Sequence, residues 1–262
     1  MRRLFTPRML ALHALVLTVA AVLVSLGMWQ LERLDETRTR RDFAVLRASE
    51  AVANSDALVG VSLNDLELVD ALVGRGFVGT GTYRPADEVL QRGRSYGGRQ
   101  GFHVLTPLDL DNGPTILVRR GYVPFDNELL PPVPGALPPA GSVTVTGGLE
   151  PSIPQPTGGV AQRDPDEGTL DIVFNADLAR LGPQIASDGR DVAPVLLRLD
   201  SQQPAQPGRL PIPAPPPVDG LGPHLSYAIQ WFSFAIIAVG MYALWLRRRL
   251  AGDVRAISHS PG

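Results

Sequence analysis

The chain has 262 residues, a formal net charge of −2 and no cysteine, and 44% of its residues are hydrophobic. The absence of cysteine excludes disulfides, Cys-type zinc sites and the thiolate pairs that carry copper, so we predict no copper site. All 24 basic residues are arginine, which together with the Ala, Pro and Gly bias is typical of a GC-rich bacterial coding sequence, and we expect no nucleic-acid partner.

The first apolar segment lies at residues 9–31 and contains no formally charged residue. As a helix it would be about 34 Å long, enough to cross a hydrocarbon core of about 30 Å. Residues 1–8 carry three arginines, a basic lead that also occurs in cleavable signal peptides. The apolar run is longer than the roughly 7–15 residues usual in such peptides, and no small-x-small cleavage motif follows it. These features favour an uncleaved transmembrane helix.

Residues 32–73 are predicted to form a helical stalk and a connector. Within them, Phe43, Leu46, Ala48 and Val52 have helical spacing. We therefore expect the first helix to continue beyond the apolar run, through residues 42–55.

A β-rich domain is predicted over residues 74–203. Its apolar runs are short, rich in β-branched and aromatic residues, and separated by Gly, Pro, Asn or Asp, which indicates a small antiparallel sheet or barrel. The expected strands are 76–83, 88–92, 101–110, 115–123, 142–149, 170–175 and 195–200.

Three short segments of this domain carry other signals. Residues 175–181, followed by Gly182-Pro183, are typical of one short helix with a cap and a stop. Residues 76–81 are glycine-rich, but no lysine and no helix follow, so glycines at a bulge or bend are favoured over a phosphate-binding loop. The proline-rich residues 131–139 are expected to form a surface loop.

A second apolar segment, residues 224–246, follows a connector at residues 204–223 that contains eight prolines. The connector should be semi-rigid and polyproline-like, reaching up to about 3.1 Å per residue. The segment has no formally charged residue when histidine is neutral, and it predicts a second transmembrane helix. Residues 247–262 form a basic tail with four arginines against one aspartate.

Charge predicts the orientation of both helices. Each end of the chain has a net side-chain charge of +3, whereas residues 32–223 carry 17 arginines against 25 acidic residues. By the positive-inside tendency, both termini should be cytoplasmic and the central domain extracytoplasmic. The predicted fold class is an α+β membrane protein of the bacterial plasma membrane, with two transmembrane helices flanking an extracytoplasmic, mostly-β domain.

The start of the second helix holds a candidate site. His224, Tyr227, Ala228 and Trp231 recur at i, i+3, i+4 and i+7, so they share one helix face. An imidazole can offer a nitrogen to iron, and the two aromatic rings could wall a flat macrocycle. An aromatic belt at the membrane surface explains the same residues without any ligand, so both interpretations stay open.

The first helix carries a matching cluster, Trp29, Gln30 and Arg33, at its outer end. If the two helices pair, Gln30 could hydrogen-bond across to Gln230 or His224. Arg33 would suit an anionic group, such as a propionate or a lipid phosphate, by bidentate pairing. An arginine that snorkels to water at a helix end is the alternative.

Four blocks, in this order, resemble the signature blocks of the Surfeit-locus-one family of cytochrome c oxidase assembly factors. The chain departs from the family pattern at Arg119, where an asparagine is usual, at Tyr122, where a tryptophan is frequent, and at residues 221–223, where an asparagine often stands. The four blocks are GMWQLER at residues 27–33, GFHVLTPL at 101–108, VRRGYVP at 118–124 and HLSYAIQWF at 224–232.

The resemblance implies a role in maturing oxidase subunit I together with other assembly factors, by transiently holding haem a, or an intermediate state of the haem site, during insertion. In this interpretation, His224 is a ligand of the haem iron and the other cofactor-binding positions are Tyr227, Trp231, Trp29, Gln30 and Arg33. His103 lies in a matched block, but we expect it to be structural, either bonded to a backbone carbonyl or exposed on the sheet.

Two other functional classes stay in view. A membrane scaffold could hold oxidase subunits together without touching haem. A membrane-tethered hydrolase is disfavoured, because the sequence contains no GxSxG, HExxH or Walker motif, so we predict no catalytic set and no enzymatic activity.

Overall fold

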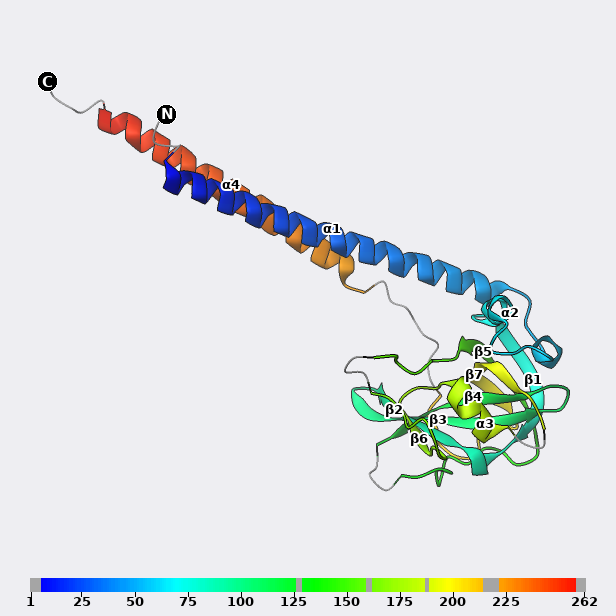
Figure 1. Cartoon of the computed structure of the whole chain (residues 1–262). Helices are drawn as coiled ribbons and strands as arrows, with labels where there is room; N and C mark the ends of the chain where they lie inside the picture. The colour runs from blue at the N-terminus through cyan, green and yellow to red at the C-terminus, as the bar shows by residue number, and fades with distance from the viewer. Residues whose placement is uncertain (1–5, 126–128, 159–161, 187–188, 214–221, 258–262) are drawn as a thin grey trace. The chain divides into compact units, whose positions relative to one another are not determined.

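The computed structural model describes residues 6–125, 129–158, 162–186, 189–213 and 222–257. The chain divides into two compact units, one made of Met1–Phe43 with Asp219–Gly262 and the other of Ala44–Val218. The first unit is a pair of helices and the second is a β-rich domain (Figure 1).

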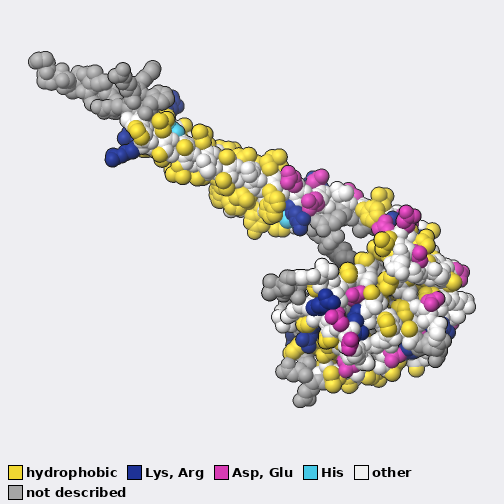
Figure 2. Space-filling view, in the orientation of Figure 1, with side chains coloured by type: hydrophobic (Ala, Val, Ile, Leu, Met, Phe, Trp, Pro, Cys, Tyr) yellow, Lys and Arg dark blue, Asp and Glu magenta, His cyan; other side chains and the backbone are white. Residues whose placement is uncertain are grey.

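The first unit contains helix α1 (Pro7–Ser49) as far as Phe43 and helix α4 (His224–Ile257). By length and composition, α1 and the part of α4 from His224 to Leu250 could each cross a membrane. Hydrophobic side chains cover most of the visible surface of the pair (Figure 2). The expected continuation of the first helix beyond its apolar run is confirmed, although α1 ends at Ser49 rather than at residue 55.

The two helices pack along a seam with a 3.5-residue repeat. Shielded positions on both helices alternate at spacings of four and three, the pattern of i±3 ridges packed into i±4 grooves. Small residues are frequent among them, and small residues let two helix backbones approach closely without a hydrophobic driving force. The seam is formed by Met9, His13, Val16, Ala20, Leu23, Gly27 and Gln30 of α1, and by His224, Ala228, Trp231, Ala235, Ala238 and Tyr242 of α4.

Gly27 shows how close the approach is. A Cβ atom at this position would lie only 2.6 Å from the ring of Phe232 on α4. Further along, Arg249 Nη1 lies 3.2 Å from the sulfur of Met9, so the two helices run antiparallel. The antiparallel arrangement places the end of the first apolar segment beside the start of the second.

The second unit is built on a sheet of seven strands, and each expected strand is present. The β1–β5–β7–β4–β3 strands close into a barrel because β1 also pairs with β3, and β2 and β6 extend from β3. The strands are β1 (Gly76–Tyr83), β2 (Val89–Tyr96), β3 (Arg99–Leu110), β4 (Thr115–Pro124), β5 (Ser142–Pro151), β6 (Ile172–Val173) and β7 (Val192–Gln203).

The barrel-like expectation is confirmed, but a purely antiparallel sheet is not. Strand β4 pairs with β7 in parallel, and β2 pairs with β6 in parallel. A parallel pair needs a long crossover between its strands. The segments between β2 and β6, and between β4 and β7, each contain other strands and supply that length.

The helices of this unit are short. They are α2 (Leu66–Leu72), α3 (Leu178–Ile185) and the 3₁₀ turns η2 (Ser55–Leu58) and η3 (Pro85–Asp87). The expected stop at Gly182-Pro183 is wrong, because α3 begins after the cap residue Asp177 and runs through Pro183. Its buried face extends to Ile185, and that packing keeps the last turn helical despite the proline.

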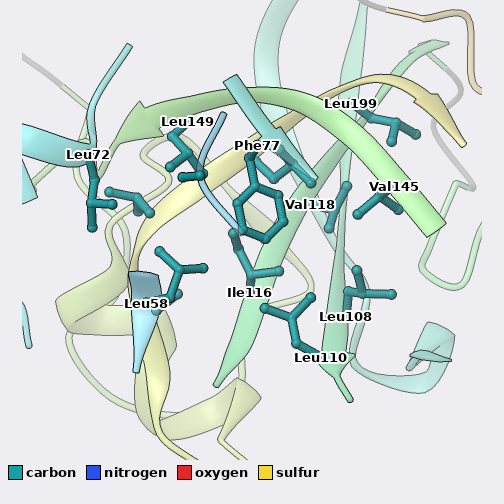
Figure 3. Close-up of a cluster of buried hydrophobic side chains, with 14 of the residues drawn as sticks. Leu58, Leu72, Phe77, Leu108, Leu110, Ile116, Val118, Val145, Leu149 and Leu199 are labelled. Carbon is teal, nitrogen blue, oxygen red and sulfur yellow. The ribbon is translucent and has the colours of Figure 1, made fainter. Parts of the chain in front are cut away.

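The barrel interior is filled by aliphatic side chains around Phe77 (Figure 3). Phe77, Leu108, Ile116 and Val145 have no exposed surface. Complete burial of such a side chain stabilises the fold by about 1.5–3 kcal/mol. A second apolar cluster, which includes Leu105, is covered by α3 on the barrel's outside.

Two proline-rich segments depart from expectation. Residues 131–139 are not simply a surface loop, because Val133 and Ala136 are buried in a third apolar cluster with Leu90 and Phe102. The first half of the predicted connector also packs on the domain. Ile212 exchanges backbone hydrogen bonds of 2.7 and 2.8 Å with Tyr122. Residues 214–221 of the predicted connector lie outside the described residues.

Candidate functional site

The predicted contact between the two helices is present. His224 Nδ1 lies 2.9 Å from Oε1 of Gln30, and both side chains are partly buried in the seam. An amide oxygen only accepts, so Nδ1 of His224 carries the proton and donates it. The other ring nitrogen, Nε2, therefore keeps its lone pair and is the atom that can bind a metal or accept a hydrogen bond.

Gly222 lies beside that nitrogen and places no side chain against it. Its backbone has φ +60°, and a Cβ atom would lie 3.0 Å from both Nε2 and Cδ2 of His224. Any side chain at residue 222 would therefore crowd the imidazole edge that does not face Gln30. The turn at Gly222-Pro223 immediately precedes α4 and brings this glycine beside the first residue of the helix.

The other predicted site residues are arranged less closely. Trp231 lies on the same seam as His224 and is partly buried. Trp29 and Tyr227 are 54% and 46% exposed, so their rings cover the outside of the pair rather than a space between the helices. Arg33 pairs with Glu36 at 2.7 Å, one turn further along α1.

The seam beside His224 is closed. Ala228 is only 1% exposed, and the ring of Phe232 lies against Gly27. A flat macrocycle has no room between the helices at this level. The apolar surfaces available near His224 are instead the exposed rings of Trp29 and Tyr227.

A second polar contact at the other end of the pair was not predicted. The hydroxyl of Tyr242 hydrogen-bonds Nδ1 of His13, and the two rings meet edge to face with centroids 5.7 Å apart. Tyr242 also stacks on Trp245, and the guanidinium of Arg249 lies over the Trp245 ring. A histidine and a tyrosine within apolar runs were the available signal, because each needs a polar partner there.

The β-rich domain holds a buried polar network around Arg120. Arg120 Nη1 lies 3.2 Å from Oε2 of Glu88, which also accepts the hydroxyl of Thr106 at 2.8 Å. The backbone N–H of Val133 donates to Oε1 of Glu88 at 2.9 Å, and Arg120 Nη2 donates to Gln206 at 2.8 Å. Burial raises the pKa of Glu88 and lowers that of Arg120, and the ion pair opposes both shifts.

This network explains the Arg-Gly pair of the third sequence block. Arg120 is the extra residue of a β-bulge, because Val104 pairs with Gly121 and Leu105 pairs with Arg119. Gly121 has φ +144°, and a Cβ there would lie 2.2 Å from the carbonyl oxygen of Ile212. The pair therefore docks the segment 204–213 onto the barrel.

The expectation for His103 is met in part, because its side chain is partly exposed on the outside of the sheet. Its side chain is neither bonded to a carbonyl nor fully exposed, since Nδ1 is buried and has no hydrogen-bond partner. Burial, together with the charges of Arg119 and Arg94, lowers the pKa of His103 to about 4. The residue is therefore neutral at pH 7.

No group of three or more His, Asp or Glu side chains with metal-site geometry occurs among the described residues. A site for iron built from these side chains in the described part of the chain would therefore have fewer than three of them as ligands. The hydrogen bond from Nδ1 of His224 to Gln30 leaves Nε2 of the neutral ring as a possible ligand atom.

The family model described as SURF1 family matches residues 17–236. The chain belongs to the SURF1 family. The match includes Gln30 and His224 as well as Arg120, so both polar arrangements lie within the family region, whereas His13 and Tyr242 lie outside it. The four sequence blocks quoted above also lie within it.

Several SURF1-like proteins resemble the chain. An uncharacterized SURF1-like protein of Mycobacterium tuberculosis is 39% identical over 165 residues, covering 63% of this chain and 56% of that protein. The chain thus covers little more than half the length of that relative. A SURF1-like protein of Monosiga brevicollis is 28% identical over 91% of this chain and 88% of its own length, and one of Rickettsia conorii is 26% identical over 92% and 93%.

Proposed function

We propose that this SURF1 family member is an assembly factor for haem–copper (cytochrome c) oxidase, which holds haem a while subunit I matures. Membership of the family supports the assembly role. In this proposal α1 and α4 span the bacterial plasma membrane with both termini cytoplasmic, and the β-rich domain is extracytoplasmic. Subunit I and other assembly factors are the partners.

One observation carries the haem part of the proposal, namely the Gln30–His224 hydrogen bond of 2.9 Å. It fixes the imidazole so that Nε2 is the unprotonated nitrogen, and Gly222 keeps the space beside that atom open. When bound, haem a would supply an iron that can take the Nε2 nitrogen of His224 as a ligand. A single such nitrogen allows release, which a carrier needs.

The remaining residues have distinct tasks in this proposal. Gln30 orients the imidazole, and Trp231 packs beside it in the seam. Trp29 and Tyr227 offer exposed aromatic surface to an apolar macrocycle. Arg33 already has Glu36 as a partner, so binding of a propionate would require it to exchange that carboxylate for another.

The experiment is purification of the full chain from cells that make haem a, followed by its visible spectrum. The proposal predicts a haem a spectrum for the wild-type chain and its loss in the His224→Ala variant. Gln30→Ala should weaken retention without abolishing it, because the iron ligand remains while its tautomer is no longer fixed.

His13→Ala is the matched control, because it removes a histidine from the same helix pair at the opposite end. It should keep the haem. If no haem co-purifies with the wild-type chain and His224→Ala still supports full oxidase activity, the haem proposal is wrong. The second function, a scaffold that holds oxidase subunits without binding haem, would then remain.

A further inference from the structure

A row of polar side chains crosses five neighbouring strands on the outside of the barrel. From β5 to β2 it consists of Glu150, Arg198, Arg119, His103 and Arg94, one residue from each strand in the order β5–β7–β4–β3–β2. In β3, β4 and β7 the row residue is partly exposed while both of its sequence neighbours are buried. On these three strands, charge therefore reaches the surface at the row residues.

The row has more positive charge than its own carboxylates can match. Arg119 and Arg198 are direct cross-strand neighbours, an arrangement that is destabilising unless the charges are shared. Glu150 pairs with both, since it bonds Arg119 and lies 3.7 Å from Nη1 of Arg198, and Asp200 takes Arg198 as well. No carboxylate is left for the third arginine.

Arg94 is that third arginine. Its Nε is buried without a hydrogen-bond partner, and no side-chain hydrogen bond or ion pair joins Arg94 to another of the described residues. Burial and the charge of Arg119 lower the pKa of Arg94, and the charge of Glu150 opposes this shift. Three further atoms of the row or beside it are also buried without a hydrogen-bond partner among the described residues, namely Nε of Arg119, Nδ1 of His103 and Oε1 of Gln91. Buried polar atoms of native proteins are normally satisfied, so their concentration here indicates a missing partner.

The surrounding strands extend the same charge. The β2–β3 hairpin, residues 89–110, contains three arginines against one acidic residue, Asp109, although residues 32–223 as a whole carry more acidic residues than arginines. Arg92 and Arg99 of this hairpin are exposed. The hairpin is therefore a positively charged region in a domain whose net charge is negative. Complementary charge on a partner would select that partner and orient it against the hairpin.

We propose that the row docks an acidic segment of a partner protein, with Arg94 and Arg119 receiving a carboxylate beside His103. Carboxylates pair with guanidinium groups through charge-assisted hydrogen bonds, and the side chains of Arg94 and Arg119 are both partly exposed. This face belongs to the β-rich domain and uses none of the residues assigned to haem, so it extends the proposed function rather than depending on it.

The probe is a fluorescein-labelled poly(Glu-Gly) peptide, titrated into the detergent-solubilised full chain and followed by fluorescence anisotropy at low ionic strength. We expect saturable binding that weakens with added salt, and about tenfold or greater loss in the Arg94→Gln/Arg119→Gln variant. Arg94→Lys, which keeps the charge, should retain part of the binding. Arg163→Gln, which removes an exposed arginine paired with Asp166, should bind like the wild-type chain.

A second readout is the pKa of His103, measured by NMR titration of its ring protons. Because a docked carboxylate stabilises the imidazolium, the acidic peptide should raise this pKa, and a neutral poly(Gln-Gly) peptide should not. Equal binding by the wild-type chain and the folded double variant would overturn the proposal. So would a rise in this pKa when chain in phosphatidylcholine nanodiscs is moved to phosphatidylglycerol, because that result would assign the row to lipid headgroups.

Discussion

Arg120 of β4 and Glu88, which immediately precedes β2, form an ion pair whose two side chains are almost fully buried, with 3.2 Å between Nη1 and Oε2. Thr106 and the N–H of Val133 complete the carboxylate's hydrogen bonds, and Gln206 takes the other end of the guanidinium. The pair therefore joins the barrel to both proline-rich segments, at residues 131–139 and 204–213.

Removal of one partner should be strongly destabilising. In Arg120→Met, Glu88 is left as a buried charge without a counterion, and we expect the free energy of unfolding to fall by about 3–5 kcal/mol. The double variant Arg120→Met/Glu88→Gln should recover part of this loss, because the neutral amide oxygen can still accept from the N–H of Val133 while its NH2 group donates to the hydroxyl of Thr106. Urea unfolding of the detergent-solubilised chain, followed by far-UV circular dichroism, measures both changes.

The control for this pair is Arg163→Met, which breaks an exposed ion pair with Asp166 and should cost about 0–1 kcal/mol. Equal losses for Arg120→Met and Arg163→Met would show that the buried pair does not hold the domain together.

The strands could be predicted from the sequence because their signal is local. The β1 run at residues 76–83 alternates buried and less buried positions and has turn residues at its ends. A barrel was one of the two expected forms, but the strand pair that closes it could not be predicted, because the β1–β3 pairing joins Gly81 to Leu110 and depends on contacts far apart in sequence. The same holds for the parallel β4–β7 pair, whose crossover has no distinctive pattern of its own.

In the candidate site, too, one part has a local sequence signal and another depends on contacts far apart in sequence. The Gln30–His224 contact was predictable as one of two options, because each residue stands at the edge of an apolar run. The polar row could not be predicted from the sequence, because it forms only when five strands are in register and a bulge at Arg120 shifts Arg119 opposite Leu105. A polar residue inside an otherwise buried strand, such as Arg198 within VLLRLD, was the only local signal.

The close approach of the helices at Gly27 makes a second prediction. Gly27→Leu places a side chain where the Phe232 ring already lies, so the helices should separate. Cysteines introduced at His13 and Tyr242, which contact each other across the pair, should cross-link in the native background and much less in Gly27→Leu. The chain has no other cysteine to interfere.

Gly240→Leu is the matched control for Gly27→Leu. It adds the same side chain to α4 at a glycine whose Cβ would meet nothing within 4 Å. Its cross-linking yield should equal that of the parent, and a loss as large as in Gly27→Leu would mean that the seam is not the cause.

The space beside His224 Nε2 makes a third prediction. Gly222→Ala adds a methyl group 3.0 Å from that atom and should lower the amount of haem a that co-purifies with the chain. An alanine at positive φ is strained wherever it stands, so strain must be separated from crowding. Gly60→Ala does this, because Gly60 has φ +72° and open space around its Cβ.

Gly60→Ala should carry as much haem as the wild-type chain, measured as absorbance per mole of protein. If Gly222→Ala also retains the full amount while His224→Ala loses it, the iron would have to approach the imidazole from a direction that Gly222 does not limit.

The low pKa of His103 makes a fourth prediction, on the pH dependence of stability. Its folded-state pKa of about 4 lies below the usual value of about 6.5, so the unfolded chain takes up a proton first as the pH falls. The stability of the β-rich domain should therefore decrease from about pH 6.5 downward and level off below about pH 4, with a total loss of about 1–2 kcal/mol once solvent screening of a partly exposed side chain is allowed for.

His103→Gln removes the titrating group while keeping a polar side chain of similar reach, so this part of the pH dependence should disappear. The free energy of unfolding of the variant should therefore rise relative to that of the wild-type chain as the pH is lowered. Urea unfolding at a series of pH values compares the two. The positive charges of Arg94 and Arg119 cause part of the effect, so Arg94→Gln should reduce the acid-side loss without removing it. Parallel pH profiles for wild type and His103→Gln would mean that His103 is protonated equally in the folded and unfolded chains, and that the row does not repel an imidazolium.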